Sequence, residues 1–311
     1  MSKKKQEIKK PVFFDFDDTL FKGDSLLYWM RYYYKKRPFR RFFLIFNGIG
    51  ILLYLLRLID GAFLKRIFLL PVGYEKQEKL EELTASFAKE ELIPRCYREM
   101  WELLCLHQAL GHQVVIISAS ATFYLKELKS FLPECIVLGT EVVFPKKGLF
   151  RFPQYEHGNI KKENKIHLLR RLYPNIEGEC RAFAYSDSIT DLPLLEFAEF
   201  PCCVHPDKEL GVLAKKGQWR CYFPDGPQNE WRVRFWKLFL LMFLTEAFNK
   251  SLKNCWGFSF TLPKGSELQP SPHKIKDLVL QVKSQKKDWI AYFPRLEKEK
   301  ALKEAVDKLL G

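Results

Sequence analysis

Two aspartates with the spacing of a catalytic pair, Asp15 and Asp17, stand near the start of the chain in the run DFDDT. They lie at the end of a short apolar segment. One carboxylate of such a pair could attack phosphorus, while the other protonates the leaving oxygen and later deprotonates water. The spacing by itself is weak support, because surface loops and helix N-caps also use Asp. Its weight depends on what else the chain brings to the same place.

A second acidic group, Asp187 with Asp191, follows another apolar segment in the run SDSITD. Carboxylate oxygens are the hard ligands that a small divalent cation takes, and phosphate contacts the same cation. We therefore expect Mg²⁺ as the cofactor. The alternative is structural: Asp187 or Ser188 could simply cap a helix that begins near Asp191.

Two further polar residues suit a phosphoryl group. Ser118 follows the apolar run 114–117 and could donate its hydroxyl to a phosphate oxygen, although Ser is also common at a helix N-cap. Lys165 opens a helical stretch and could neutralise the phosphoryl charge. Lys161 and Lys162 are rivals for that role.

The elements that must position these residues alternate along the chain. Apolar runs at 11–16, 114–117, 181–185 and 201–204 predict buried strands, and helical stretches at 94–110, 122–131 and 165–173 lie between them. Such alternation predicts an α/β fold with a Rossmann-like parallel sheet and helices on both faces. Because ligands bind at the carboxyl ends of such strands, the polar residues should converge. Residues 135–152 predict one more strand and a small hairpin.

These motifs, in this order, resemble those of the haloacid-dehalogenase superfamily over residues 12–222. The resemblance implies a phosphatase in which Asp15 is the nucleophile and Asp17 the general acid and base. Two positions depart from the commonest pattern, since Asp18 and Ser186 stand where Gly is frequent. Neither departure removes a reactive group.

The same resemblance assigns the remaining site residues. The phosphoryl group would be bound with the help of Thr19, which also supports Asp17 and its loop, and by Ser118 and Lys165. The groups expected at Mg²⁺ are Asp15, Asp17 through its backbone carbonyl, Asp187 and, in support, Asp191.

Four segments are expected from the composition along the chain: a basic tail at 1–10, a core at 11–23 and 106–225, a helical cap at 24–105 inserted after the first strand, and an extension at 226–311. The extension predicts a small α+β unit, with helices at 235–248 and 296–310 around short strands. The basic tail lacks the apolar core of a signal peptide.

The cap contains fifteen uncharged residues at 42–56, preceded by Arg37, Arg40 and Arg41. This stretch is shorter than the ~20 residues expected of a spanning helix. Either it is buried against the core, or it lies in a membrane interface. The helical cap resembles that of phosphoserine phosphatases (subfamily IB). Together with the run YSDS at 185–188, the arginine-flanked cap is also similar to bacterial phosphatidylglycerophosphate phosphatases.

The charge balance, 51 Lys and Arg against 37 Asp and Glu, favours anionic partners: a phosphorylated substrate, an anionic membrane surface or nucleic acid. Nucleic acid is disfavoured, because no reader motif accompanies the charge. Eight cysteines without a CxxC pair indicate neither a zinc site nor a disulfide framework, which fits a reducing cytosol. We expect a cytoplasmic protein, in one interpretation at the inner face of a membrane.

The functional prediction is a Mg²⁺-dependent phosphomonoester hydrolase with an aspartyl-phosphate intermediate, acting on a phospholipid headgroup. One alternative keeps the chemistry and takes a small soluble metabolite such as a phosphoserine-like ester. A second alternative is an inactive membrane-associated or scaffold protein, which the intact Asp15, Asp17, Ser118 and Asp187 disfavour. The sequence leaves the oligomeric state open.

Overall fold

The structure is a computed structural model and describes residues 10–145, 151–173 and 182–224. The expectations for the basic tail at 1–9 and for the extension at 226–311 lie outside the described residues.

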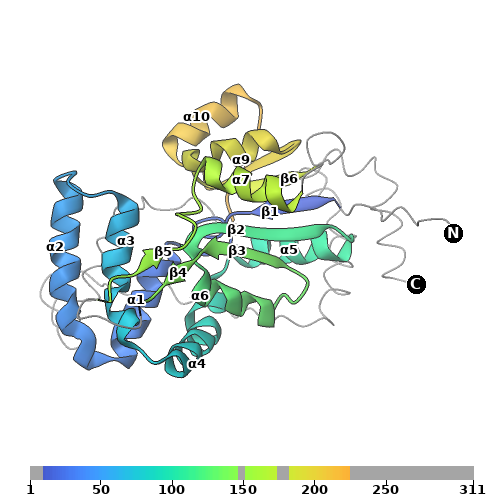
Figure 1. Cartoon of the computed structure of the whole chain (residues 1–311). Coiled ribbons are helices and arrows are strands. Elements are labelled where there is room, and N and C mark those ends of the chain that lie inside the picture. Colours follow the sequence, from blue (N-terminus) through green and yellow to red (C-terminus); the bar gives the residue numbers. More distant parts are fainter. Residues whose placement is uncertain (1–9, 146–150, 174–181, 225–311) are drawn as a thin grey trace, which may run out of the picture.

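A parallel sheet of six strands forms the centre of the described part, in the order β3-β2-β1-β6-β7-β8 (Figure 1). In chain order, its strands are β1 Pro11–Phe14, β2 Gln113–Ala121, β3 Ile136–Thr140, β6 Phe183–Ser186, β7 Phe200–Val204 and β8 Arg220–Tyr222. All neighbouring pairs run parallel. The predicted Rossmann-like sheet is confirmed.

Helices cover both faces of the sheet because its apolar residues alternate between them. Phe13 packs with the helices α7 Glu163–Leu172, α9 Leu192–Phe197 and α10 Lys208–Lys216 on one face. Val12 and Phe14 point to the other, where α5 Arg98–Ala109 and α6 Thr122–Leu125 lie (Figure 1). Fully burying such a side chain is worth roughly 1.5–3 kcal/mol, so the two apolar layers fix the helices on the sheet.

The order of the strands places a topological switch point at β1. The chain proceeds from β1 outward to β2 and β3, then returns to β6 on the other side of β1. Crevices for ligands form at the carboxyl ends of strands at such a point. Asp15 directly follows β1 and Asp187 directly follows β6, so both stand at this crevice.

A helical region separates β1 from β2. It contains α1 Ser25–Lys36, α2 Leu44–Leu55, α3 Gly61–Leu69 and α4 Gln77–Phe87, joined in part by 3-10 turns at Pro38–Phe43 and Leu70–Tyr74. Trp29 of α1 ties this region to the core, because its ring packs edge-on against Phe87 and Phe123 and stacks on Tyr124. This packing holds the cap helices in place above the carboxyl end of β2.

One stretch of this region, Pro38–Leu55, is long and apolar enough to cross a membrane by length and composition alone. It does not run as one regular α-helix, because a 3-10 helix at Pro38–Phe43 precedes α2.

The strand and the small hairpin predicted within 135–152 are both present. The strand is β3, which pairs parallel to β2 at the edge of the main sheet. The hairpin pairs β4 Val142–Val143 with β5 Gln154–Tyr155 in antiparallel fashion. Its second strand lies beyond residue 152, later in the chain than predicted.

His107 is a buried titratable group that connects α5 to β6. Its Nε2 lies 2.9 Å from the hydroxyl of Tyr185, and its Nδ1 lies 2.8 Å from Nδ1 of His112. Burial, and then the neighbouring charge of His112, lower the pKa of His107 well below its ordinary value. The folded protein therefore keeps this ring neutral.

We predict that this ring makes the protein less stable in acid. In the unfolded chain His titrates near 6.5, so below about that pH the unfolded state takes up a proton that folded His107 does not accept. Stability should fall as the pH is lowered from about 7.5 to about 5.5. In His107→Gln, which cannot be protonated, the melting temperature should fall less over the same range, although it starts lower.

Titrating groups that do not contact His107 are common to both proteins and cancel in the difference between their two pH profiles. Equal falls in melting temperature for the native chain and for His107→Gln, measured by circular dichroism, would contradict this account of His107.

Candidate active site

Four elements bring the predicted site residues to one edge of the sheet. Asp15 follows β1, Ser118 lies within β2, Asp187 follows β6, and Lys165 lies in the first turn of α7. Residues as far apart in the sequence as Asp15 and Asp187 therefore share one crevice, as the parallel topology predicts.

The centre of the crevice is a buried ion-pair network around Lys165. Its Nζ donates to Oδ1 of Asp15 and to Oδ2 of Asp191, each at 2.6 Å. Ser186 donates its hydroxyl to the same oxygen of Asp191 at 2.7 Å. Burial alone would lower the pKa of Lys165, but the charges of Asp15 and Asp191 outweigh it and raise the pKa above its ordinary value. The ammonium is therefore permanently charged.

The structure distinguishes among the three candidate lysines. Only Lys165, of these three, has its ammonium in contact with Asp15; its side chain is 2% exposed. Lys162 is exposed. Lys161 is exposed as well, and partial desolvation of its ammonium, followed by the charge of Lys65, lowers its pKa.

Asp17 is held from two sides. Its Oδ1 accepts a hydrogen bond from the backbone N–H of Ser25 at 2.8 Å, and its Oδ2 accepts one from the hydroxyl of Ser120. Ser25 begins α1 in the cap, whereas Ser120 belongs to β2 in the core. Asp17 therefore joins the two parts of the protein, and its carboxylate has a fixed orientation beside the helix N-terminus.

The two aspartates are less acidic than usual. Burial raises the pKa of Asp15 to about 7; Lys165 opposes this shift, while Asp191 and Asp17 add to it. Burial, followed by the charge of Asp24, raises the pKa of Asp17 to about 6, while Lys65 and the hydrogen bonds from Ser120 and Ser25 oppose the shift. Carboxyl groups in this range can change protonation state near neutral pH.

Ser118 and Thr19 are buried beside these aspartates, but their hydrogen bonds differ from those predicted from the sequence. Ser118 lies inside β2 and its Oγ accepts from the backbone N–H of Ser120 at 3.0 Å, so it does not cap a helix. Strand β2 continues four residues beyond the apolar run, to Ala121, which is why the N-cap alternative for Ser118 is wrong. The hydroxyl of Thr19 donates to Asp187 at 3.4 Å rather than to Asp17. The alternative role for Ser188 does hold, since its hydroxyl caps the turn Ile189–Asp191 by accepting from Thr190.

Asp18 adopts a backbone conformation that explains its place in the loop. Its φ is 54°, in the left-handed region that Gly enters freely and that Asp tolerates better than most residues. The turn after β1 requires this conformation, so Asp18 can stand where related sequences favour Gly.

The acidic groups fit a magnesium ion. Burial, followed by the charges of Asp15, Asp18 and Asp191, raises the pKa of Asp187 well above its ordinary value, so the carboxylates repel one another and would be relieved by a cation. Within the described ranges, no three His, Cys, Asp or Glu side chains are grouped as a metal cage. Magnesium does not need one, because it uses one or two carboxylates and completes its shell with water and substrate phosphate.

Asp191 is better placed to position Lys165 than to hold a metal ion. One of its oxygens already accepts two hydrogen bonds, from Lys165 and Ser186. The remaining protein ligands that suit Mg²⁺ are Asp15, Asp187 and the backbone carbonyl of Asp17.

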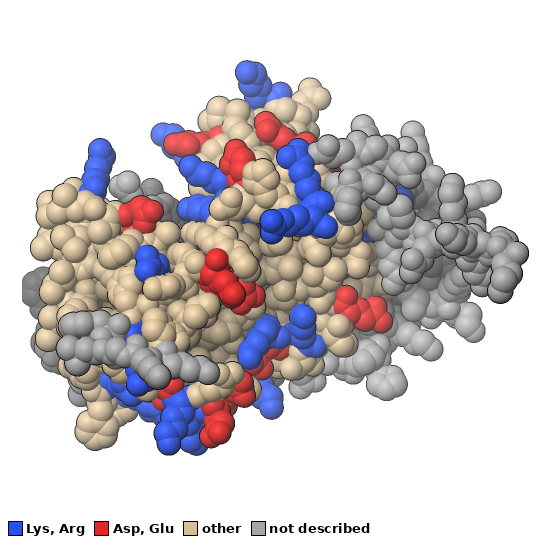
Figure 2. Space-filling model, viewed as in Figure 1, with Lys and Arg blue, Asp and Glu red and all other residues tan. Residues whose placement is uncertain are grey.

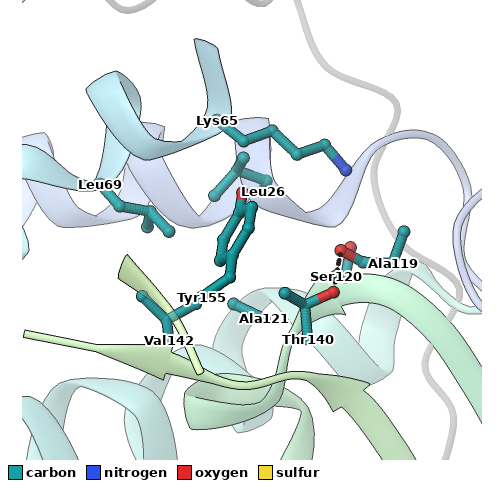
Figure 3. A pocket seen from close by; sticks show the side chains of 9 residues that line it. All are labelled: Leu26, Lys65, Leu69, Ala119, Ser120, Ala121, Thr140, Val142 and Tyr155. Atoms are coloured by element: carbon teal, nitrogen blue, oxygen red, sulfur yellow. Dashed lines mark hydrogen bonds between the residues drawn. The ribbon is translucent and has the colours of Figure 1, made fainter. Parts of the chain in front are cut away.

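A pocket beside Asp17 lies between cap and core. It is lined from the cap by Leu26, Lys65 and Leu69, and from the core by Ala119, Ser120, Ala121, Thr140, Val142 and Tyr155. Figure 3 shows the Lys65 side chain reaching from α3 toward the strand that carries Ala119 and Ser120. The pocket thus combines an apolar wall with the cation of Lys65, close to Asp17.

Three residues around Asp17 were not predicted from the sequence: Ser25, Ser120 and Lys65. Ser120 carried a signal, since it stands two residues after Ser118 and strand residues at that spacing share a face. Ser25 acts through its backbone N–H, and Lys65 reaches the pocket only through the packing of α3. Neither carries a local sequence signal.

Comparison with known proteins agrees with this geometry. Residues 12–196 match the family model described as haloacid dehalogenase-like hydrolase. A histidinol-phosphatase of Neisseria meningitidis is 27% identical over 227 residues, which is 68% of this chain and 97% of that protein.

Solved structures share the fold. A protein of unknown function from Bordetella pertussis matches with a TM-score of 0.58 and 18% identity, covering 69% of this chain and 98% of that one. A substrate-bound phosphoserine phosphatase matches more weakly, with a TM-score of 0.47 and 15% identity over 70% of this chain and 94% of its own. Because the family model spans more than half of the sequence, the chain belongs to the haloacid dehalogenase-like hydrolase family.

Proposed function

We propose that the protein is a Mg²⁺-dependent phosphatase that hydrolyses a phosphate monoester through an aspartyl-phosphate on Asp15. The observation that carries the proposal is the 2.6 Å contact between Lys165 and Asp15, which fixes one carboxylate oxygen of Asp15 and leaves the other for attack. The phosphatase relative from Neisseria meningitidis also supports it.

In the first step, the second carboxylate oxygen of Asp15 forms a bond to phosphorus while the bond from phosphorus to the ester oxygen breaks. The leaving oxygen takes the proton of the Asp17 carboxyl group. In the second step, Asp17 accepts a proton from water as that water attacks phosphorus, and the bond to Asp15 breaks. Inorganic phosphate leaves, and both aspartates return to their starting state.

The surrounding residues suit these steps. A pKa of about 6 lets Asp17 serve as acid and then as base near neutral pH. The hydrogen bonds from Ser25 and Ser120 keep its carboxyl group in one orientation. Lys165 favours the ionised form of Asp15 by opposing the burial that raises the pKa of Asp15, and Ser118 lies in β2 beside them to donate to a phosphoryl oxygen.

Mg²⁺, when bound by Asp15, Asp187 and the carbonyl of Asp17, would offset the negative charge of the carboxylates and of the phosphoryl group. Thr19 would support this arrangement by orienting Asp187, to which it donates.

For the substrate, we favour the phosphate monoester of a phospholipid headgroup. The pocket beside Asp17 places Lys65 among apolar side chains, which suits a leaving group that carries both an anionic and an apolar part. The second candidate is a small soluble phosphate ester, favoured by the name of the histidinol-phosphatase relative.

The proposed function predicts phosphate release that requires Mg²⁺ and Asp15. We expect Asp15→Asn to lower the rate by more than roughly 1,000-fold, because the amide cannot act as the nucleophile. The measurement is phosphate release from a panel of esters, including histidinol phosphate, phosphoserine and phosphatidylglycerophosphate in vesicles, with Mg²⁺ or EDTA.

The matched control is Asp60→Asn, at the exposed N-cap of α3, where Asn caps as well as Asp and the rate should not change. Release that survives in folded Asp15→Asn, or no release from any ester by the folded native chain, would refute the proposed function. The preferred ester then decides between the two substrate classes.

A second prediction separates the lysines. Lys165→Met should lower kcat by roughly 100-fold or more, because the positive charge that orients Asp15 and faces the phosphoryl group is lost. Lys165→Arg keeps the charge and should retain more activity than Lys165→Met. Lys162→Gln, at an exposed position three residues earlier, should behave like the native chain.

Circular dichroism identifies variants that fail to fold. A folded Lys165→Met with native kcat, or a loss in Lys162→Gln as large as in Lys165→Met, would contradict the role given to Lys165.

A further inference from the structure

The described surface carries one concentration of exposed apolar side chains. Of fifteen large apolar side chains exposed in the described ranges, eleven fall between residues 39 and 63. We name these eleven the docking face: Phe39, Phe42, Ile45, Phe46, Ile49, Leu52, Tyr54, Leu55, Leu56, Leu58 and Phe63. Phe39 is 94% exposed, Ile45 67% and Leu58 69%. A contiguous apolar surface of this kind marks a contact with a partner or a lipid.

Packing among the described residues does not account for this face. Helix α2 already has a buried side, formed by Leu44, Asn47, Gly50 and Ile51. It lies close to α3, since a Cβ on Gly50 would come within 2.9 Å of the Ile67 side chain. The outward side of α2 is therefore apolar in addition to its core-facing side. A helix that is apolar all round is typical of a core or of a lipid environment.

Cations outnumber acidic groups along the docking face. Residues 25–59 contain seven Lys and Arg and no Asp or Glu, and Asp60 is the one acidic residue among positions 39–63. Arg41 and Arg57 lie within the face, and both are exposed. Figure 2 shows the surface over α2 and α3 as mostly neutral, with charged residues of both signs at its margins. Cations around an apolar surface match anionic headgroups around acyl chains.

We propose that the docking face binds the interface of an anionic lipid bilayer, with α2 lying along the membrane plane. The twelve residues of α2 extend about 18 Å, and Pro38–Leu55 reaches spanning length only with the 3-10 helix that precedes α2. The regular α-helix alone is shorter than the ~30 Å hydrocarbon core. One side of α2 is also committed to α3. Both facts favour a helix that lies in the interface over one that spans it.

The pair of helices α2 and α3 also leads to the crevice beside Asp17. Helix α3 presents Phe63 on the docking face and Lys65 to the pocket beside Asp17, two residues apart on one helix. A bilayer held by the docking face would therefore lie one helix away from the pocket. This link to the site rests on the proposed function, whereas membrane binding itself does not require catalysis.

The test is co-sedimentation of the full chain with vesicles of phosphatidylcholine alone or mixed with phosphatidylglycerol. We expect binding that is stronger with phosphatidylglycerol. The triple variant Ile45→Ser, Ile49→Ser, Leu52→Ser should bind roughly 100-fold more weakly, because three side chains that would enter the acyl region become polar. Arg41→Gln with Arg57→Gln should reduce the preference for phosphatidylglycerol by roughly fivefold per charge.

The matched control is Val212→Ser, which replaces a side chain that is 64% exposed on α10, outside the docking face, and should leave binding unchanged. Asp15→Asn should bind vesicles like the native chain, so a failure of catalysis and a failure of docking are told apart. Native sedimentation by the folded triple variant would overturn the proposal. So would light scattering that shows a dimer lost in the triple variant without any vesicle binding, since the face would then bind a second copy.

Discussion

The site depends on one buried ammonium, that of Lys165, placed between the carboxylates of Asp15 and Asp191. Removing one partner of a buried ion pair typically costs about 3–5 kcal/mol, because the other is left unpaired in a medium of low polarity. The contact also holds α7 against β1 and the loop after β6. The same atoms therefore position Asp15 and join these three elements at the edge of the sheet. Ser186 completes the network by holding the shared oxygen of Asp191.

Around that contact the site has an excess of negative charge. Asp15, Asp17 and Asp187 all have raised pKa values because burial penalises their ionised forms. A fold that concentrates carboxylates in this way favours a divalent cation, whose binding would draw them back to the ionised state. Asp17 differs from the other two because it accepts hydrogen bonds from two donors, one in the cap and one in the core. The orientation of its carboxyl group therefore depends on how the cap sits on the core.

The sequence allowed the sheet and the positions of Asp15, Asp17 and Asp187 to be predicted, because the carboxyl ends of parallel strands must meet at one edge. The sequence did not show which of the three lysines contacts Asp15, because the answer depends on where α7 begins relative to β1. Ser120 was overlooked because β2 continues beyond the apolar run that suggested its end. The sequence did not show that α2 is exposed either. Its one strongly polar side chain, Asn47, lies on the buried side, so the pattern gives no polar face that marks the exposed side.

The measurement that tests the central claim most directly is chemical trapping of the intermediate. The native chain is mixed with substrate and Mg²⁺, quenched in acid during turnover and reduced with borohydride, which converts an acyl phosphate of aspartate to homoserine. Mass spectrometry of the peptides should then find homoserine at position 15 and aspartate at positions 17 and 187. Turnover with no modification at Asp15, or with the modification at Asp17 instead, would contradict the account.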